Sequence, residues 1–171
     1  PDIIGFNDIF NQLSVLKMSV YAPVSYILPS RLAKYEALYD TDVKGGGGKL
    51  RQRDREQSLQ ALMTVNLLKR LESSVHSFRL SLQRLKDNHL CTLAKIENFK
   101  KTGRDASVAD VAPAFENAEP DDDELPSPDD DQIGGKVQIS LADMDIPAWE
   151  HDLGADLTII DALLTEMHKI A

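Results

Sequence analysis

The sequence has a single cysteine, Cys91, among its 171 residues. One thiol excludes an intramolecular disulfide and a zinc site built on several thiolates, which fits a reducing interior and favours a cytoplasmic location. No basic segment followed by an apolar one resembles a secretory signal, and no uninterrupted apolar run approaches the ~18 residues that a membrane helix needs. We therefore expect a soluble single domain, with neither secretion nor membrane insertion.

Reactive side chains are also sparse. Cys91 lies between Leu90 and Leu93 without an adjacent basic residue, so the sequence predicts a buried thiol rather than a nucleophile. Ser73 and Ser74 are expected in the middle of a helix and lack the glycines of a nucleophile elbow. No catalytic triad, nucleotide cradle or general-acid pair is evident, so this chain alone is not expected to be an enzyme.

The histidines give little indication of a metal site. His76 and His89 are too far apart in sequence to be two ligands one helical turn apart. His151 with Asp152 and Asp156 forms only a weak cluster, and we expect exposed or capping roles for all of these residues. The sequence thus predicts no metal and no cofactor in this chain.

Positive charge is scarce in the second part of the chain. Residues 1–104 hold 17 of the 19 Lys and Arg against 10 Asp and Glu, a net charge of +7, whereas residues 105–171 hold 2 against 18, a net charge of −16. This asymmetry can indicate a surface for nucleic acid with an acidic segment that competes for it. The plainer interpretation is two solvated surfaces that attract each other.

Four consecutive glycines, Gly45 to Gly48, precede Lys49 in a stretch that superficially suggests a phosphate-binding loop. That motif also requires glycine at position 43 and serine or threonine at position 50, where Val43 and Leu50 stand. A flexible hinge or an artificial splice is the better interpretation, because glycines in a row lose much backbone entropy on ordering.

Glycine and proline are absent from Leu50 to Lys101, where most residues favour helix. One continuous helix over about 50–101 would be ~78 Å long at 1.5 Å per residue. A bend, a stutter or a change of packing partner is expected near residues 86–90, because the spacing of the apolar residues changes at His89. The expected apolar seam consists of Val65, Leu68, Leu71, Val75, Phe78, Leu82 and Leu85, followed by Leu93, Ile96 and Phe99.

The flanking regions complete the predicted domain organisation. Residues 1–102 form a helical region that includes a first amphipathic helix from Phe6 to Val20, and residues 103–136 form a disordered acidic loop. Residues 137–171 return to the bundle through a possible short strand and a helix capped by Asp156, with Trp149 filling the joint. The predicted fold class is all-α, a helical bundle built around one very long helix with at most a short strand.

The stretch "LLKRLESSV" carries a family resemblance. It resembles the LLRR-x-x-x-x-V pattern of Swi/Snf-type superfamily-two ATPases, particularly its form in large bacterial helicase-like proteins. The match places Leu67, Leu68, Arg70 and Val75 on the pattern, with Lys69 in place of the more usual arginine. A looser likeness covers "LPSRLAKYEALYD" at 28–40, which precedes the LLKR segment here and follows it in many family members.

The resemblance implies a role without catalytic groups. In that family the segment belongs to a helical insertion between two RecA-like lobes that move along duplex DNA as ATP is hydrolysed. The groups that bind ATP and Mg²⁺ would lie in the rest of a longer parent protein, of which this chain would be a piece. The flanking lobes would be its partners, and a bacterial, nucleoid-associated location would follow.

Basic side chains on the long helix are the candidates for contact with double-stranded DNA, which would be non-specific and salt-dependent. An alternative from another class is a helical module for protein interaction or self-association, with the acidic loop as a regulatory tether. The candidates for DNA contact are Arg51, Arg53, Arg55, Lys69, Arg70, Arg79 and Arg84.

Overall fold

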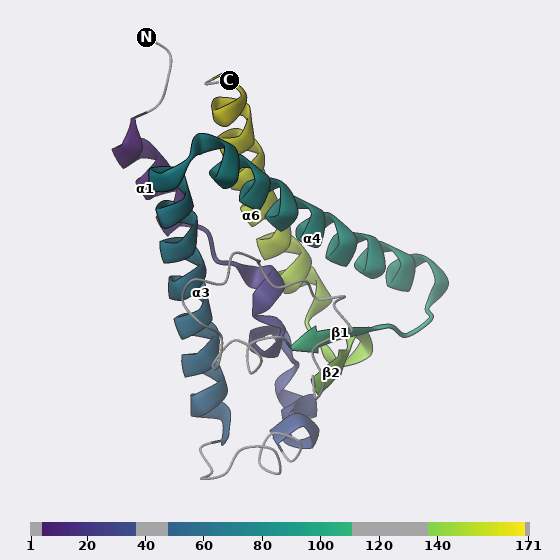
Figure 1. Cartoon of the computed structure of the whole chain (residues 1–171). Coiled ribbons are helices and arrows are strands. Elements are labelled where there is room, and N and C mark those ends of the chain that lie inside the picture. Colours follow the sequence, from purple (N-terminus) through teal and green to yellow (C-terminus); the bar gives the residue numbers. More distant parts are fainter. Residues whose placement is uncertain (1–4, 37–47, 111–136, 170–171) are drawn as a thin grey trace.

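The computed structural model of the chain describes residues 5–36, 48–110 and 137–169. Within them the protein is mostly helical, as the sequence predicts (Figure 1). Helix α4 packs against α6 and also contacts α3, and these three helices supply half of the buried apolar residues of the core. Their bounds are Gly48–Ser73 for α3, Val75–Thr102 for α4 and Ile146–His168 for α6.

The prediction of one very long helix over 50–101 is wrong. The chain leaves the helical conformation at Ser74, whose φ of −168° and ψ of 131° are those of extended backbone. The change of direction produces a corner from which α3 and α4 diverge (Figure 1). Residues 86–90 belong to α4 as uninterrupted helix, so the helical stretch is broken at Ser74 and not there.

A local hydrogen bond explains the position of the corner. The Ser74 Oγ accepts a hydrogen bond from the Ser77 amide at 3.2 Å, which satisfies one of the free N–H groups at the start of α4. At the other end, Gly103 adopts a left-handed conformation with φ of 69°, and its amide donates to the Phe99 carbonyl. Serine just before the first helical residue favours a helix start, and glycine just after the last one favours a helix end.

Helix α6 also begins earlier than the sequence predicts. Asp145, not Asp156, is the N-cap, because its carboxylate accepts a hydrogen bond from the Ala148 amide at 3.3 Å. Pro147 occupies the first turn, where a missing amide hydrogen costs nothing. Trp149 is buried in this turn, as expected, and its indole Nε1 donates to the Ser19 carbonyl at 2.8 Å.

The first helix, α1 (Phe6–Ser14), ends before the expected limit at Val20. Met18 then adopts a left-handed conformation with φ of 52°, which redirects the chain toward α6. The stretch after it forms short 3-10 turns, with residues 32–36 helical beyond them. These turns are Ser19–Tyr21 (η1), Pro23–Tyr26 (η2) and Pro29–Arg31 (η3).

Two strands are present where at most one was expected. β1 (Ser107–Asp110) pairs antiparallel with β2 (Val137–Ser140), with Ser107 opposite Ser140 and Asp110 opposite Val137. The prediction of a disordered loop is therefore wrong for residues 103–110, while residues 111–136 lie outside the described part. A short turn, η4 (Leu141–Asp143), connects β2 to α6.

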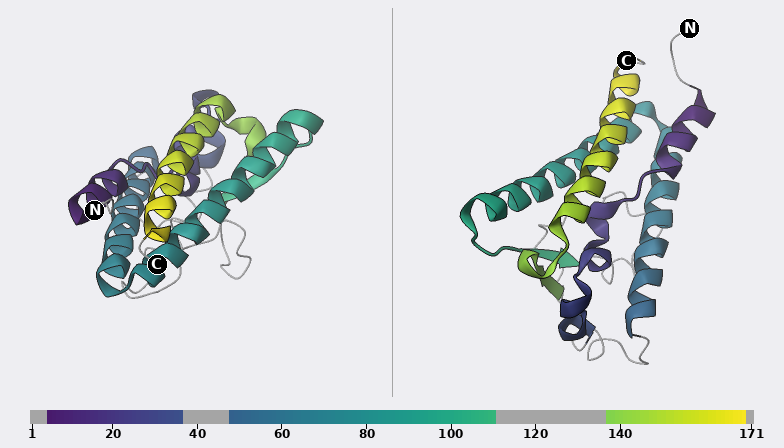
Figure 2. Two further views of the ribbon diagram at one scale, coloured as in Figure 1. Left: turned by 90° about the horizontal axis from the view of Figure 1, so that it is seen from above. Right: turned by 180° about the vertical axis from the view of Figure 1, so that it is seen from behind.

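The first and last described helices meet at one end of the molecule. α1 begins and α6 ends on the same side in opposed views (Figures 1 and 2), and the two helices are in contact. No helix in the described part is both long and apolar enough to cross a membrane.

Candidate functional site

The LLKR residues and Val75 form the α3–α4 corner. Leu67 is fully buried, and Leu68 and Val75 pack partly buried against the core. Lys69 is exposed and Arg70 half-buried in the last turns of α3. Because α3 ends at Ser73, the pattern spans two helices, and its apolar members pack against the core before and after the turn.

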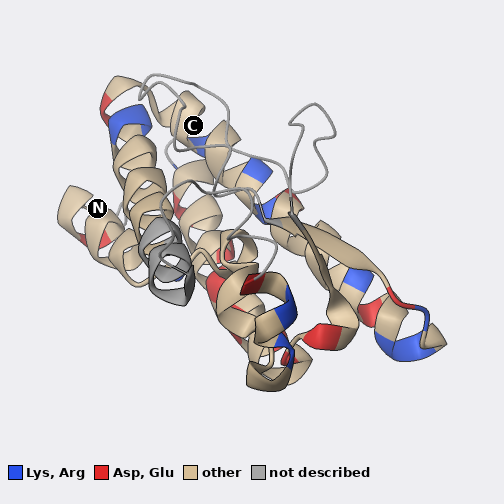
Figure 3. Cartoon of the chain, turned by 90° about the horizontal axis from the view of Figure 1, so that it is seen from below, with Lys and Arg blue, Asp and Glu red and all other residues tan. Residues whose placement is uncertain are grey.

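The basic candidates are spread along α3 and α4. Arg51, Arg53 and Arg55 lie in the first turns of α3, and their side chains lie outside the described part. Arg51 and Lys69 are separated by ~27 Å along the helix at 1.5 Å per residue. On α4, Arg79 is half-buried near the corner and Arg84 is exposed further along. Lys and Arg are distributed over several elements in Figure 3, with Asp and Glu between them.

Ion pairs link the basic and acidic parts of the chain, as the plainer interpretation of the charge asymmetry predicts. Lys86 Nζ lies 2.8 Å from Asp161 Oδ1, and Lys100 Nζ lies 3.2 Å from Glu150 Oε1, so both pairs join α4 to α6. These pairs are partly or largely exposed, so each contributes less than ~1 kcal/mol to stability. Further pairs of this kind among the described residues are Lys17–Asp152, Arg31–Asp143 and Lys34–Asp143.

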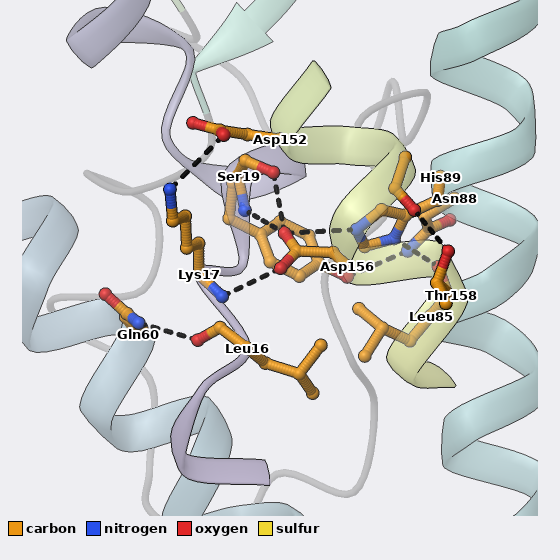
Figure 4. Close-up of polar contacts among 12 residues, drawn as sticks. Leu16, Lys17, Ser19, Gln60, Leu85, Asn88, His89, Asp152, Asp156 and Thr158 are labelled. Carbon is orange, nitrogen blue, oxygen red and sulfur yellow. Dashed lines mark hydrogen bonds and ion pairs between the residues drawn. The ribbon is translucent and has the colours of Figure 1, made fainter. Parts of the chain in front are cut away.

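Asp156 is the least exposed carboxylate in the described part of the chain, in the middle of α6 and only 1% exposed. Its carboxylate accepts hydrogen bonds from the Lys17 amide at 2.8 Å, the Ser19 amide at 3.0 Å and the Ser19 hydroxyl at 2.6 Å (Figure 4). The left-handed Met18 turns both amides toward α6. We refer to Asp156, Ser19, the Lys17 amide and His89 as the Asp156 cluster.

His89 completes the cluster from α4, where it is fully buried. Its Nε2 lies 3.7 Å from Asp156 Oδ2, which is too long for a hydrogen bond but close enough for an electrostatic interaction. Burial raises the pKa of the Asp156 carboxyl, but His89, the Ser19 hydroxyl and the two backbone amides outweigh burial and lower that pKa below its ordinary value. The expectation of exposed or capping roles is thus wrong for both residues.

A second polar cluster links the short helical segment 32–36 to η4 and to the end of β2. The Tyr35 hydroxyl donates to Asp143 Oδ2 at 2.5 Å and accepts from the Ser140 amide at 3.0 Å. Burial and the neighbouring Asp143 carboxylate raise the pKa of Tyr35 to about 12. Hydrogen bonds from Lys34 and Tyr35 lower the pKa of the Asp143 carboxyl despite its burial. We assign this cluster a structural role, because its polar groups already form hydrogen bonds or ion pairs with one another.

Other chemically notable residues do not converge. Cys91 is exposed on α4, contrary to the predicted buried thiol, because it lies opposite the face that packs on α6. His76 and His151 are exposed, as expected. Asp152 receives the Tyr26 hydroxyl at 2.6 Å and the Lys17 ammonium at 3.2 Å. Among the described residues, no group of three or more His, Cys, Asp and Glu is arranged to hold a metal ion.

Comparison with known proteins finds no family model, no curated protein and no solved structure that matches this chain.

Proposed function

We propose that this chain is a non-catalytic helical insertion of a DNA-dependent, helicase-like ATPase, which positions the motor lobes and contacts the duplex backbone. The observation that carries the proposal is the LLKR segment, which resembles the Swi/Snf-type pattern. Leu67 is buried in the last two turns of α3 and Val75 is the first residue of α4, so the stretch that carries the pattern crosses from one helix to the other. A segment with this position sets the direction of both helices, which is the geometric task of a spacer between lobes.

The arrangement of the helix ends also supports this proposal. An inserted domain is accommodated best when its two connections lie close together, because the host then needs little rearrangement. Here α1 begins and α6 ends at the same end of the molecule (Figure 2). Both connections can therefore reach one region of a host motor.

ATP and Mg²⁺ belong to the parent protein in this proposal. The residues that bind them would lie in the motor lobes that flank this chain. The present chain would contribute rigidity and basic side chains, of which Lys69 and Arg84 are exposed in the described part. A contact with phosphate would be strongly dependent on salt, because each neutralised phosphate releases counterions.

The test is a titration of labelled duplex DNA with the full chain, followed by fluorescence anisotropy at low and moderate salt. We expect binding at low salt that is lost as salt rises. Replacing Lys69 and Arg84 with alanine should weaken binding several-fold and reduce the slope of log affinity against log salt by about 2.

The matched control removes two charges from the far end of α4. Lys100 and Lys101 are exposed and pair with Glu150 and Glu97. Their replacement with alanine changes the net charge equally and should have a smaller effect. Equal losses in both double variants would indicate a response to net charge alone, and no binding at any salt would reject contact with DNA.

A second candidate, a module for protein interaction or self-association, is favoured by α1. Phe6 and Phe10 lie one helical turn apart and are 48% and 45% exposed, whereas Ile9 and Leu13 on the adjacent side are buried. The apolar face of α1 is therefore wider than the part of it that packs against the core. The acidic stretch 103–136 would be a regulatory tether in this alternative.

Sedimentation velocity distinguishes self-association from the proposed role. Self-association through α1 predicts a faster species at high concentration that disappears when Phe6 and Phe10 are replaced with serine. Replacing exposed Leu80 and Leu90 on α4 with serine provides the control. A monomer at every concentration rejects self-association and leaves the insertion proposal intact.

A further inference from the structure

The position of the His89 protons follows from the local hydrogen bonds. His89 Nδ1 lies 2.8 Å from the Leu85 carbonyl oxygen. A carbonyl oxygen can only accept, so Nδ1 carries a hydrogen and donates it. Gain or loss of a proton by this imidazole therefore takes place at Nε2.

The Nε2 atom is buried and has no hydrogen-bond partner in the described part of the chain. The nearest charged atom is Asp156 Oδ2 at 3.7 Å. Two of the hydrogen bonds to Asp156 come from backbone amides, which can only donate, so the carboxyl is held in its anionic form. A neutral Nε2 would direct a lone pair at this anion, whereas a protonated Nε2 would form an ion pair with it.

We propose that His89 and Asp156 form a proton-dependent clasp between α4 and α6, closed when His89 is protonated and loosened when His89 is neutral. A histidine ring can be neutral or protonated, so His89 is the member of the pair whose charge can change. Asp156 stays a carboxylate near neutral pH because its pKa lies below the ordinary value for aspartate. The proposal is independent of the function proposed above.

The other ionisable groups near His89 in the described part already form ion pairs or hydrogen bonds with other residues. On α6, Asp152 pairs with Lys17 and Asp161 with Lys86, one turn or more from Asp156. From η1, the buried Tyr21 hydroxyl accepts a hydrogen bond from Asn88 at 2.9 Å, and burial raises the pKa of this phenol, which keeps it neutral.

No charged side chain of α3 approaches the clasp in the described part. The described charged residues of that helix, Lys69, Arg70 and Glu72, precede Ser74. His89 lies fourteen residues into α4, which is ~21 Å from the helix start at 1.5 Å per residue. Asp156 is therefore the single acidic partner that the described structure gives His89.

The clasp is linked through Ser19 to Trp149, whose fluorescence can report on it. Asp156 accepts from the Ser19 amide and hydroxyl, and the Ser19 carbonyl accepts from Trp149 Nε1 at 2.8 Å. Trp149 is the only tryptophan in the chain and is buried. Loosening of the clasp should therefore change the environment of this indole.

The test follows Trp149 emission and the imidazole ¹⁵N shifts of the full chain from pH 5 to pH 9. We expect a single transition in Trp149 emission toward longer wavelength as pH rises, with the same midpoint as the change at His89 Nε2. The exposed histidines, His76, His151 and His168, supply internal references with their own midpoints.

Two variants complete the experiment. His89→Gln should abolish the Trp149 transition, and His76→Gln, an exposed change on the same helix, should leave it unaltered. If His89→Gln does not fold, coincidence of the two midpoints in the unaltered chain still decides the matter. The proposal is overturned if Trp149 emission stays constant while His89 titrates, if His89 does not titrate in this range, or if the transition persists in a folded His89→Gln variant.

Discussion

The Ser74 Oγ accepts a hydrogen bond from the Ser77 amide at 3.2 Å, and this contact starts α4 as the chain turns out of α3. Replacing Ser74 with alanine should lower the free energy of unfolding by ~1 kcal/mol, because an N-cap is lost. Urea denaturation monitored by circular dichroism measures the change.

Ser73→Ala is the matched control, because Ser73 is the exposed last residue of α3 and should tolerate the change within ~0.5 kcal/mol. The sign of the Ser74→Ala effect is informative. If the helix continued through this position, alanine would stabilise it by a few tenths of a kcal/mol, since alanine is the better helix former. Stabilisation would therefore contradict the corner.

Asp156→Asn should reduce the free energy of unfolding by ~3 kcal/mol, because the buried amide cannot accept all the hydrogen bonds that the carboxylate receives. Thermal and urea denaturation at neutral pH measure the loss. Asp87→Asn, an exposed change on α4, should have little effect. Comparable losses in the two variants would show that burial of Asp156 does not matter to stability.

The lowered pKa of Asp156 also predicts acid sensitivity. The unfolded chain binds this proton at the ordinary value of 3.8, and the folded chain binds it only at lower pH. The contribution of Asp156 is thus present above pH 3.8 and is lost as pH falls through the folded-state pKa. Stability curves of the unaltered protein and Asp156→Asn should converge below that pH, and parallel curves would contradict the assignment.

Tyr35→Phe removes the hydroxyl that lies between Asp143 and the Ser140 amide. We expect a loss of ~2 kcal/mol, since a buried amide and carboxylate each lose a partner. In a double-mutant cycle with Asp143→Asn the two losses should not add, because they remove one shared contact. Full additivity would indicate that the two side chains act independently.

The raised pKa of Tyr35, about 12, predicts behaviour at alkaline pH. An unfolded tyrosine ionises near its ordinary value of 10.0, so the stabilisation by Tyr35 is complete below pH 10 and is lost as pH rises toward 12. Ultraviolet titration of phenolate absorbance should show one component near pH 12 that is absent from Tyr35→Phe.

Arg51, Arg53 and Arg55 provide the strongest test of contact with DNA at the start of α3. Their joint replacement with alanine should reduce the salt slope of duplex binding by about 3 if each contacts a phosphate. Joint replacement of Lys100, Lys101 and Arg104 with alanine removes the same charge at the C-terminal end of α4 and just after it. A larger effect of this control would place the contact away from the start of α3.

Periodicity predicted the buried face of α4 correctly. Phe78, Leu82 and Leu85 belong to the expected seam and are fully buried, because a three-and-four spacing keeps them on one side of a helix. In α3 the seam is shifted, with Met63 and Leu67 buried and Val65 46% exposed. The break at Ser74 changes which sequence positions face the core in α4 relative to α3. One continuous spacing of apolar residues therefore could not fit both helices.

The corner itself was difficult to predict from the sequence. Neither glycine nor proline interrupts residues 50–101, and a serine in a helical stretch is compatible with both an interior position and an N-cap. Packing on α6 favours the break, because α4 can follow that helix only after the chain turns. Long-range packing of this kind leaves no local signal.

The Asp156 cluster did have a signal in the sequence. Trp149, Leu153, Asp156 and Ile160 follow a four-and-three spacing, which places the aspartate on the apolar face of α6. A cap was predicted instead, because aspartate is a common N-cap residue. The partners Ser19 and Lys17 come from a non-helical turn far away in the sequence, which spacing alone could not have identified.

The antiparallel register of β1 and β2 has a consequence for how this protein tolerates change in length. Asp110 stands opposite Val137, so both attachment points of residues 111–136 are strand neighbours, ~5 Å apart. The entropy of closing a loop grows only with the logarithm of its length, and doubling it costs ~0.6 kcal/mol. The pairing of β1 with β2 thus holds the two ends of any segment that joins Asp110 to Val137 side by side, which makes these two strand ends a natural place to attach a fluorescent tag or a binding peptide.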